Sequence, residues 1–186
     1  MVFPRSTRHA RVTWVRGIRA ARKGGAGAGF TLVEIMVVVV VISLLAAIAV
    51  PSFRRIQRKA KTTAIANDFR VFGAAFDTYA QETGRWPADT AVGVFPAAMA
   101  QRINQAAWQR KTPMGGKYNW EYHRNHFGVT YQAAIAIGAA AGAPLPLDVN
   151  QLIDLEHMID SPKRIDWLGG TFHLGSGIVP LYIIQQ

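Results

Sequence analysis

The chain has 186 residues, no cysteine and a formal net charge of +10, and half of its residues are hydrophobic. This length allows one membrane segment and one modest domain. Without cysteine, the chain has no thiol nucleophile, no disulfide and no Cys-ligated zinc or iron–sulfur centre, so its fold depends on core packing or on contacts with other subunits. A positive charge of this size would ordinarily suggest a nucleic-acid partner.

Residues 1–29 carry much of that charge and are predicted to be a basic leader, because targeting segments must be separated from the fold. Seven cationic residues and no acidic residue precede Gly29: Arg5, Arg8, Arg11, Arg16, Arg19, Arg22 and Lys23. Without the leader, 21 minus 7, or 14, basic residues remain against 11 acidic ones, a net charge of +3. Most of the positive charge that suggested a nucleic-acid partner therefore belongs to the leader and not to the rest of the chain.

Residues 30–50 form an apolar run whose only charged residue is Glu34. At about 1.5 Å per residue the run reaches about 30 Å as a helix, which matches a bilayer core. Its valine-rich part, Ile35–Ile42, suits a strand or a helix, but a lone strand cannot satisfy its backbone in lipid, so we predict a helix. Cations flank both ends, so loop charge does not fix the orientation. An ordinary secretory signal cut near Ala46–Ala49 is the alternative.

Glu34 is the unusual residue of this segment, because a carboxylate in an apolar helix is costly and is therefore a functional hypothesis. If the chain is cut after Gly29, Phe30 gains an α-amine that could pair with Glu34, within one helix or between staggered neighbours. The simpler alternative is an acid near the helix end whose carboxylate reaches the interface.

The stretch Gly29–Glu34 (Gly-Phe-Thr-Leu-Val-Glu), followed by the apolar run and Pro51, resembles the class III signal of type IV pilins and type II secretion pseudopilins. The resemblance implies that a prepilin peptidase cuts after Gly29 and that the new N-terminal residue, Phe30, is methylated. It implies that Glu34, the fifth mature residue, aids subunit docking, and that Pro51, the twenty-second, bends the helix.

The same resemblance implies a location and a set of partners. The leader would lie in the cytoplasm, residues 30–50 would cross the inner membrane once, and the C-terminal domain would lie in the periplasm before assembly into a filament. The partners would be the prepilin peptidase, other pilin or pseudopilin subunits, and an inner-membrane assembly platform.

Residues 51–83 continue the helix in amphipathic form. We expect a kink at Pro51, which lacks a backbone donor. A single face is marked by the spacing 4, 3, 4, 3 of Ile65, Phe69, Phe72, Phe76 and Tyr79. Thr83-Gly84 and Pro87 should end the helix, which we predict from about Thr31 to Glu82. Its first half would lie in lipid and its second half against a domain.

A basic cluster follows the membrane segment: Arg54, Arg55, Arg58, Lys59 and Lys61. The cluster can be a plain membrane flank, or it can bind one of three partners: inner-membrane lipid headgroups, acidic groups along a filament, or nucleic acid. Nucleic acid is included because exposed cations bind phosphate without sequence preference.

Residues 84–186 are predicted to form a periplasmic domain. The expected elements are a short helix around Ala97–Trp108, strands at Lys117–His123 and Val129–Ile137, a helix at Val149–Ile159 capped by Asp148, and strands at Thr171–Leu174 and Ile178–Ile184. Their hairpin-like connections predict an α+β fold, in which the long N-terminal helix packs on a small antiparallel sheet. Glu82–Pro87 and Pro113–Tyr118 are similar to the spacing in major pseudopilins, although the second motif lacks the usual acid, the aromatic residue and a second proline.

Candidate chemical sites in this domain are weak. Glu121, His123 and His126 are the best metal candidates, but they fall at a strand end without a fixed third ligand. Asp160 and Asp166 flank Lys163-Arg164 and are interpreted as solvated loop charges. We therefore expect no metal, no cofactor and no catalytic residue.

The sequence leaves two alternative functions for the chain. The first is a structural subunit of a type IV pilus or a type II secretion pseudopilus. The alternative is a membrane-anchored periplasmic enzyme or binding domain that uses residues 30–50 only as an anchor. Glu34→Ala separates them, because a plain anchor should tolerate the change and a filament subunit should fail to assemble.

Overall fold

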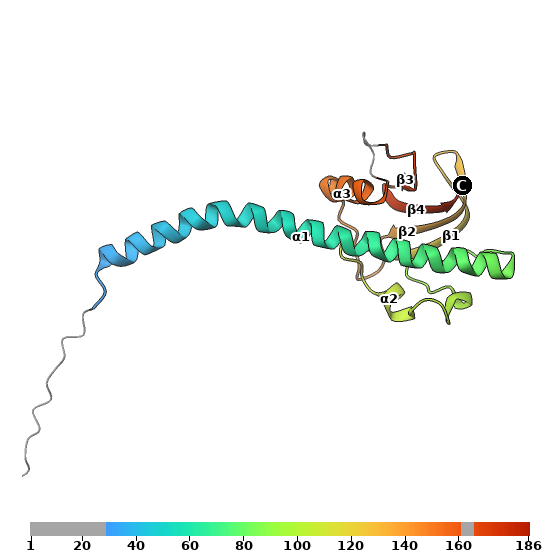
Figure 1. The fold of residues 1–186 in the computed structure, drawn as a ribbon, viewed down its shortest axis with the longest axis horizontal. Helices are drawn as coiled ribbons and strands as arrows, with labels where there is room; N and C mark the ends of the chain where they lie inside the picture. Colours follow the sequence, from blue (N-terminus) through green and yellow to red (C-terminus); the bar gives the residue numbers. More distant parts are fainter. Residues whose placement is uncertain (1–28, 161–165) are drawn as a thin grey trace, which may run out of the picture. The chain divides into compact units, whose positions relative to one another are not determined.

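A computed structural model describes residues 29–160 and 166–186, and its dominant element is helix α1, Leu32–Thr83 (Figure 1). The helix begins where the Thr31 hydroxyl accepts a hydrogen bond from the Glu34 backbone N–H at 3.1 Å, and Gly84 follows its end with a φ of 70°. The predicted continuous helix is confirmed, and it runs through Pro51. The bend at Pro51 stays a prediction. The chain divides into two compact units between Ser43 and Leu44, and the packed domain lies in the second.

The segment between α1 and the sheet contains two short helical pieces in place of the predicted single helix. These are a 3₁₀ turn, η1, at Ala97–Met99 and helix α2 at Gln105–Gln109. The single helix over Ala97–Trp108 is therefore wrong. The break comes at Asn104, whose backbone is extended and whose side chain accepts from the Ala107 N–H, so a new helix starts there.

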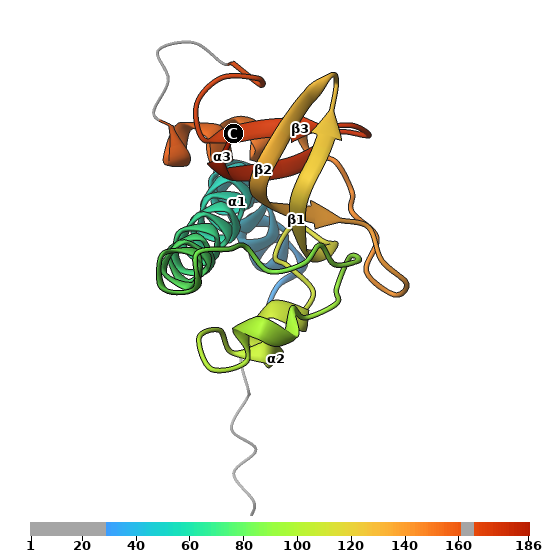
Figure 2. The ribbon, with the colours of Figure 1, turned by 90° about the vertical axis from the view of Figure 1, so that its right-hand side faces the viewer.

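The sheet has four antiparallel strands in the order β1-β2-β4-β3 (Figure 2). The strands are β1 Lys117–His126, β2 Val129–Gly138, β3 Phe172–Gly175 and β4 Val179–Gln185. Helix α3, Val149–Ile159, lies between β2 and β3 in the chain and is capped by Asp148. The strands, α3, its cap and the antiparallel α+β arrangement are confirmed, with β1 extending to His126.

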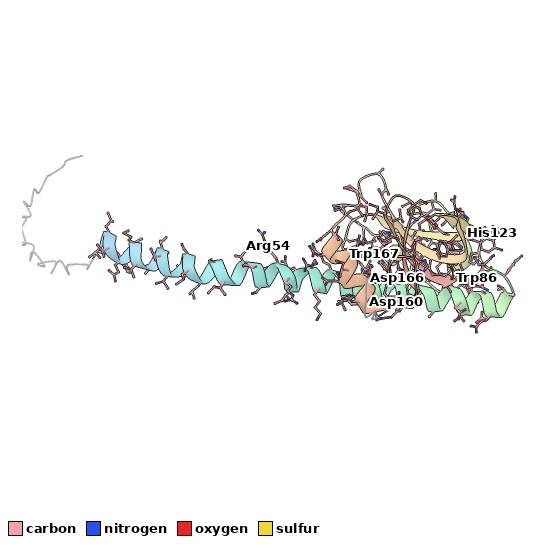
Figure 3. The ribbon with its side chains drawn as sticks, turned by 90° about the horizontal axis from the view of Figure 1, so that it is seen from above. Arg54, Trp86, His123, Asp160, Asp166 and Trp167 are labelled. Atoms are coloured by element: carbon pink, nitrogen blue, oxygen red, sulfur yellow. The ribbon has the colours of Figure 1, made fainter. Side chains whose placement is uncertain are left out.

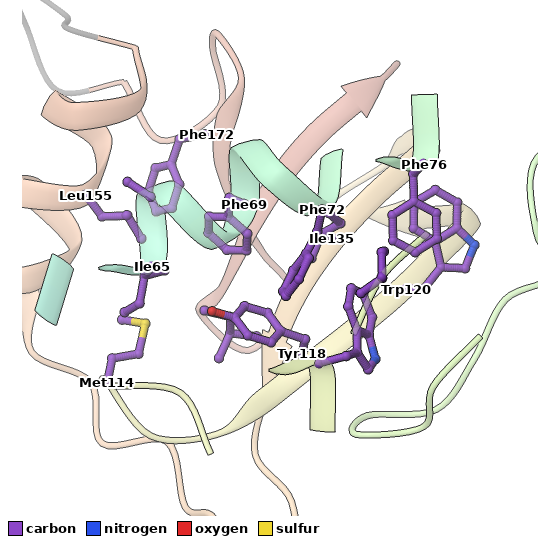
Figure 4. Packing of buried hydrophobic residues seen from close by; sticks show 14 of the residues in the cluster. Ile65, Phe69, Phe72, Phe76, Met114, Tyr118, Trp120, Ile135, Leu155 and Phe172 are labelled. Carbon is purple, nitrogen blue, oxygen red and sulfur yellow. The ribbon is translucent and has the colours of Figure 1, made fainter. Parts of the chain in front are cut away.

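The core forms where the second half of α1 packs on one face of the sheet (Figure 4). Phe76 stacks on Trp120 of β1 with ring centroids 3.9 Å apart, and Phe69 stacks on Tyr182 of β4 at 5.4 Å. Gly73 lets the helix approach β4, because a Cβ there would lie 2.7 Å from Cε1 of Tyr182. The face predicted by the 4, 3, 4, 3 spacing is thus the buried face of α1.

The two motifs similar to major pseudopilins hold the loops against the sheet. Pro87 accepts a hydrogen bond from the Trp120 indole N–H at 3.0 Å. In the second motif, Gly116 donates to the Pro144 carbonyl at 3.0 Å, and its φ of 67° places it where a Cβ would lie 2.6 Å from the Gly138 carbonyl oxygen. The glycines of this motif are therefore required by the close approach of three backbone segments.

Candidate functional site

The first turn of α1 brings together the residues predicted for processing and assembly. Gly29, Phe30 and Thr31 precede the helix, and Phe30 is 76% exposed. Thr31 and Glu34 have the spacing of a capping box, and the Thr31 hydroxyl accepts the Glu34 N–H. This cap was missed in the sequence, although the pattern Thr-x-x-Glu is visible there. It also places the carboxylate at the positive end of the helix dipole.

Glu34 has no ion-pair partner among the described residues. In the uncut chain, Phe30 is joined to Gly29 and carries no α-amine, so the predicted pair with Glu34 requires cleavage. The first turn can therefore offer one carboxylate at the start of an apolar helix, and it gains a cation only if the Gly29–Phe30 bond is broken.

The apolar surface of α1 is uncovered. Every described residue from Gly29 to Gln57 is exposed, including Leu32 at 84% and Ile48 at 71%. By length and composition, one helix among the described residues could cross a membrane, and it is α1. A contiguous apolar surface of this length needs lipid or other helices to cover it.

A basic collar follows this surface, consisting of Arg54, Arg55, Arg58, Lys59 and Lys61. Arg58 donates to Asp154 of α3 at 3.0 Å, an ion pair between partly exposed side chains. The other four collar side chains are exposed, and Figure 3 shows Arg54 on the stretch of α1 before the packed part of the helix. The collar therefore presents more positive charge than the domain neutralises.

Two of the three metal candidates, Glu121 and His126, are in contact, and the third, His123, is not. The His126 Nε2 donates to Glu121 at 2.7 Å while its Nδ1 accepts the Ser176 N–H at 3.0 Å, so both ring nitrogens are used. His123 lies apart, with Nδ1 3.4 Å from the Gln132 amide oxygen. Among the described residues, no group of three metal-ligating side chains is found. The Glu121–His126 pair lies within β1, and the bond from Ser176 to His126 joins this strand to the β3–β4 turn.

Asp160 and Asp166 each accept hydrogen bonds from backbone N–H groups and do not form a catalytic dyad. The Asp160 carboxylate accepts the N–H groups of Thr171 at 2.9 Å and Phe172 at 2.6 Å, which fixes the start of β3. Asp166 accepts the Leu168 N–H at 3.2 Å. The interpretation of Asp160 as a solvated loop charge is wrong, and Lys163-Arg164 lies outside the described residues. The contact of Asp160 with Thr171 and Phe172 was not predicted from the sequence, because it joins residues on either side of the stretch 161–165.

Comparison with known proteins places the first turn of α1 in a family motif. A family model described as the prokaryotic N-terminal methylation motif matches residues 27–50. The match contains Gly29, Phe30 and Glu34, and it ends one residue before Pro51. The site is therefore of the prepilin type.

Sequence matches to known proteins support the same prepilin class. The chain is 33% identical to the type II secretion system core protein G of Klebsiella pneumoniae over 104 residues, which is 56% of this chain and 71% of the relative. It is 42% identical to core protein G of Pseudomonas aeruginosa over 59 residues, 32% of this chain and 42% of that relative. It is 33% identical to the type IV major pilin protein PilA of Myxococcus xanthus over 69 residues, 37% of this chain and 31% of the pilin.

The last two matches span less than half of each relative, whereas the Klebsiella match spans most of its length. The chain belongs to the family of type IV pilins and type II secretion pseudopilins. Members of this family are usually structural proteins, and the long N-terminal helix on a small antiparallel sheet is a pilin-like arrangement.

Proposed function

We propose that this chain is a filament subunit that is cut after Gly29, methylated on Phe30 and assembled through α1. The observation that carries the proposal is an uncovered apolar helix with Glu34 in its first turn, inside the matched methylation motif. The residues of the packed domain support a structural role, since Asp160, Glu121 and His126 are occupied by bonds within the fold.

Assembly follows from the chemistry of this helix. Apolar surface that leaves lipid can avoid water by packing against the helices of other subunits, but this attraction is non-directional and does not set a register. The Glu34 carboxylate can set the register between helices, because in an apolar filament core it requires a counter-charge at a defined position. The α-amine of Phe30 on a neighbouring subunit would supply that charge and fix the axial offset between helices.

The proposed location and partners match this mechanism. Before assembly the chain would lie in the inner membrane as a single-pass protein, with residues 84–186 in the periplasm and residues 51–83 joining them to the membrane helix. Its partners would be a prepilin peptidase, other pilin or pseudopilin subunits and an inner-membrane assembly platform. The exposed apolar residues of α1 past Pro51, Phe53 at 59% and Ile56 at 66%, would extend the helix contacts outside the bilayer.

A secretion pseudopilus is the better supported of the two filaments. The match to the Klebsiella core protein G covers 104 residues, twice the length of the 52-residue α1, and therefore includes part of the domain. The match to PilA covers 69 residues. The Glu82–Pro87 and Pro113–Tyr118 motifs, which hold the loops of the domain, support the same choice.

The test is to express the full chain with its assembly machinery and compare Glu34→Ala with Ser43→Ala. Ser43 is a matched control, since it also lies in the apolar part of α1 and its hydroxyl donates to the Val39 carbonyl of the same helix. We expect both variants to enter the membrane and to yield a mature N-terminus at methylated Phe30 by mass spectrometry. Only Glu34→Ala should lose filaments in electron micrographs and cross-links between subunits.

The alternative function, a membrane-anchored enzyme or binding domain, predicts different results in this test. An N-terminus near Pro51 would indicate ordinary secretion, and an intact leader would indicate a plain anchor. Filaments of Glu34→Ala as abundant as those of the unaltered chain would remove the role given to the carboxylate.

A further inference from the structure

The basic collar lies where the positive-inside rule does not place it. In the proposed orientation, the five cations of residues 54–61 follow the membrane segment on the periplasmic side, although Lys and Arg are normally enriched on the cytoplasmic side. Among the ion pairs of the described residues, one involves the collar, Arg58 with Asp154. The collar therefore carries unpaired positive charge at the surface, which an anionic partner could bind.

The collar occupies one side of α1. At about 100° per residue, its five positions fall within an arc of about 160° on a helical wheel. Ile65, Phe69 and Phe76, which face the sheet, lie within the same arc. The opposite side carries the exposed apolar residues Phe53 and Ile56. The cations thus continue the domain-bearing side of the helix toward the membrane, and the side available to other helices stays apolar.

Two concave sites adjoin the collar. Arg55 and Lys59 line a pocket of about 250 Å³ beside α3. Lys61 lines a second pocket, of about 360 Å³, together with Lys111 and the start of α3. Each pocket presents two cationic side chains, so a phosphate could be held by more than one charge, and Asp154, which also lines the first pocket, pairs with Arg58.

A buried donor marks the second pocket. The Gln151 side chain lines it, the residue is 6% exposed, and its Nε2 has no hydrogen-bond partner among the described residues. Asp148, whose carboxylate accepts the Asn150 N–H as the cap of α3, also lines the pocket, so one negative charge stands against the two lysines. A buried donor without an acceptor is costly, and because Nε2 itself is buried, a phosphate oxygen in the pocket would become its acceptor after a rotation of the Gln151 side chain.

We propose that the collar and these two pockets bind the phosphate groups of anionic phospholipids at the membrane surface that faces the domain. The collar begins four residues after Val50 and ends at Lys61, which places it about 6 to 16 Å beyond the end of the apolar run along a helix. Long cationic side chains at that depth reach headgroups. The lipid contacts would hold an unassembled subunit against the membrane and would have to break when the subunit enters a filament.

Position favours lipid over the two other anionic partners. Nucleic acid would have to reach a collar that lies between the domain and the apolar helix, whereas headgroups are already there. Acidic groups of a second copy would be available only after assembly. The inference rests on the proposed membrane orientation but does not depend on cleavage, methylation or filament formation.

The test uses the full chain reconstituted as a monomer in vesicles of zwitterionic phospholipid containing a minor share of a photoreactive lipid. The probe is phosphatidylglycerol or phosphatidylethanolamine with the reactive group on the headgroup, and adducts are mapped by mass spectrometry. Yields on the collar are divided by yields on the apolar stretch, so that general proximity to lipid cancels. Adducts on the leader, which is also basic, fall on separate peptides.

We expect the anionic probe to label the collar several-fold more than the zwitterionic probe, with less difference at high salt. Arg55→Gln/Lys59→Gln should lower the anionic preference by about fivefold or more, since each cation near an anionic surface contributes about that factor. Lys61→Gln/Lys111→Gln should do the same at the second pocket. The matched control is Arg85→Gln/Lys117→Gln, which removes two cations outside the collar and should keep the preference.

Three results would overturn the proposal. The first is equal labelling of the unaltered chain by both probes, which would leave the collar to an acidic protein partner. The second is an equal loss in the control variant, which would indicate a general charge effect. The third is full displacement of the anionic preference by soluble glycerol phosphate, which would indicate a free-phosphate site rather than a lipid site.

Discussion

Replacing Asp68 by alanine should lower the free energy of unfolding by about 2 kcal/mol. Asp68 lies on α1 with its side chain 15% exposed, and it accepts the Tyr118 hydroxyl of β1 at 2.6 Å while also pairing with Arg110. Tyr118 is fully buried, so removing the carboxylate leaves a buried hydroxyl without an acceptor, which costs about 1–3 kcal/mol. The Arg110 side chain is 48% exposed, and its ion pair adds little because solvent screens it.

A double-mutant cycle isolates the contact. Tyr118→Phe removes the hydroxyl and should cost about 1 kcal/mol, and adding it to Asp68→Ala should cost about 1 kcal/mol less than the sum of the two single changes. The matched control is Asp77→Ala, because Asp77 is also on α1 and is exposed, and its carboxylate accepts from the Gln81 amide. That change should stay within about 0.5 kcal/mol.

Urea unfolding of the full chain in detergent, followed by tryptophan fluorescence, provides the measurement. Trp108 packs against Tyr118 with ring centroids 5.7 Å apart, so the signal reports this part of the core. Equal midpoints for Asp68→Ala and Asp77→Ala would refute the reasoning. Strict additivity in the cycle would show that the hydroxyl and the carboxylate act independently.

Two further predictions concern the same core. Burial, and next the hydrogen bond to Asp68, raise the pKa of Tyr118 far above its ordinary value. The unfolded chain therefore loses this proton first, near pH 10, and stability should be full below that pH and fall above it by up to about 1.4 kcal/mol per pH unit. Urea midpoints between pH 8 and pH 11 test this, and Tyr118→Phe should show a shallower decline. Phe76→Ala should cost about 4 kcal/mol by losing the Trp120 stack, whereas the exposed Phe53→Ala should leave the same unfolding midpoint nearly unchanged.

The elements that could be predicted from the sequence are those set by local periodicity. The spacing of Ile65, Phe69, Phe72 and Phe76 marked the buried face of α1, because side chains three and four residues apart share one side of a helix. The strands and α3 followed from alternation and from the Asp148 cap in the same way. At the candidate site, the family motif placed Gly29, Phe30 and Glu34 together because they are neighbours in the chain.

The features that escaped prediction depend on residues far apart in the sequence. The Asp160 carboxylate accepts the Phe172 N–H because the end of α3 and the start of β3, twelve residues apart in the chain, are brought together, and no local pattern encodes that contact. The half-buried position of His126 depends on the β1–β2 hairpin reaching Ser176. The break at Asn104 was local and visible as a cap residue, but the alanine-rich sequence around it favoured a continuous helix.

The Thr31 cap has a consequence for proteolysis. Because α1 begins at Leu32, the peptide bond between Gly29 and Phe30 lies outside the hydrogen-bonded turns of the helix. Proteases bind their substrates as extended chains, and a bond inside a helix must be unwound before it can be cut. A peptidase acting after Gly29 would therefore find its scissile bond already accessible, while the cap keeps α1 intact up to two residues from the cut.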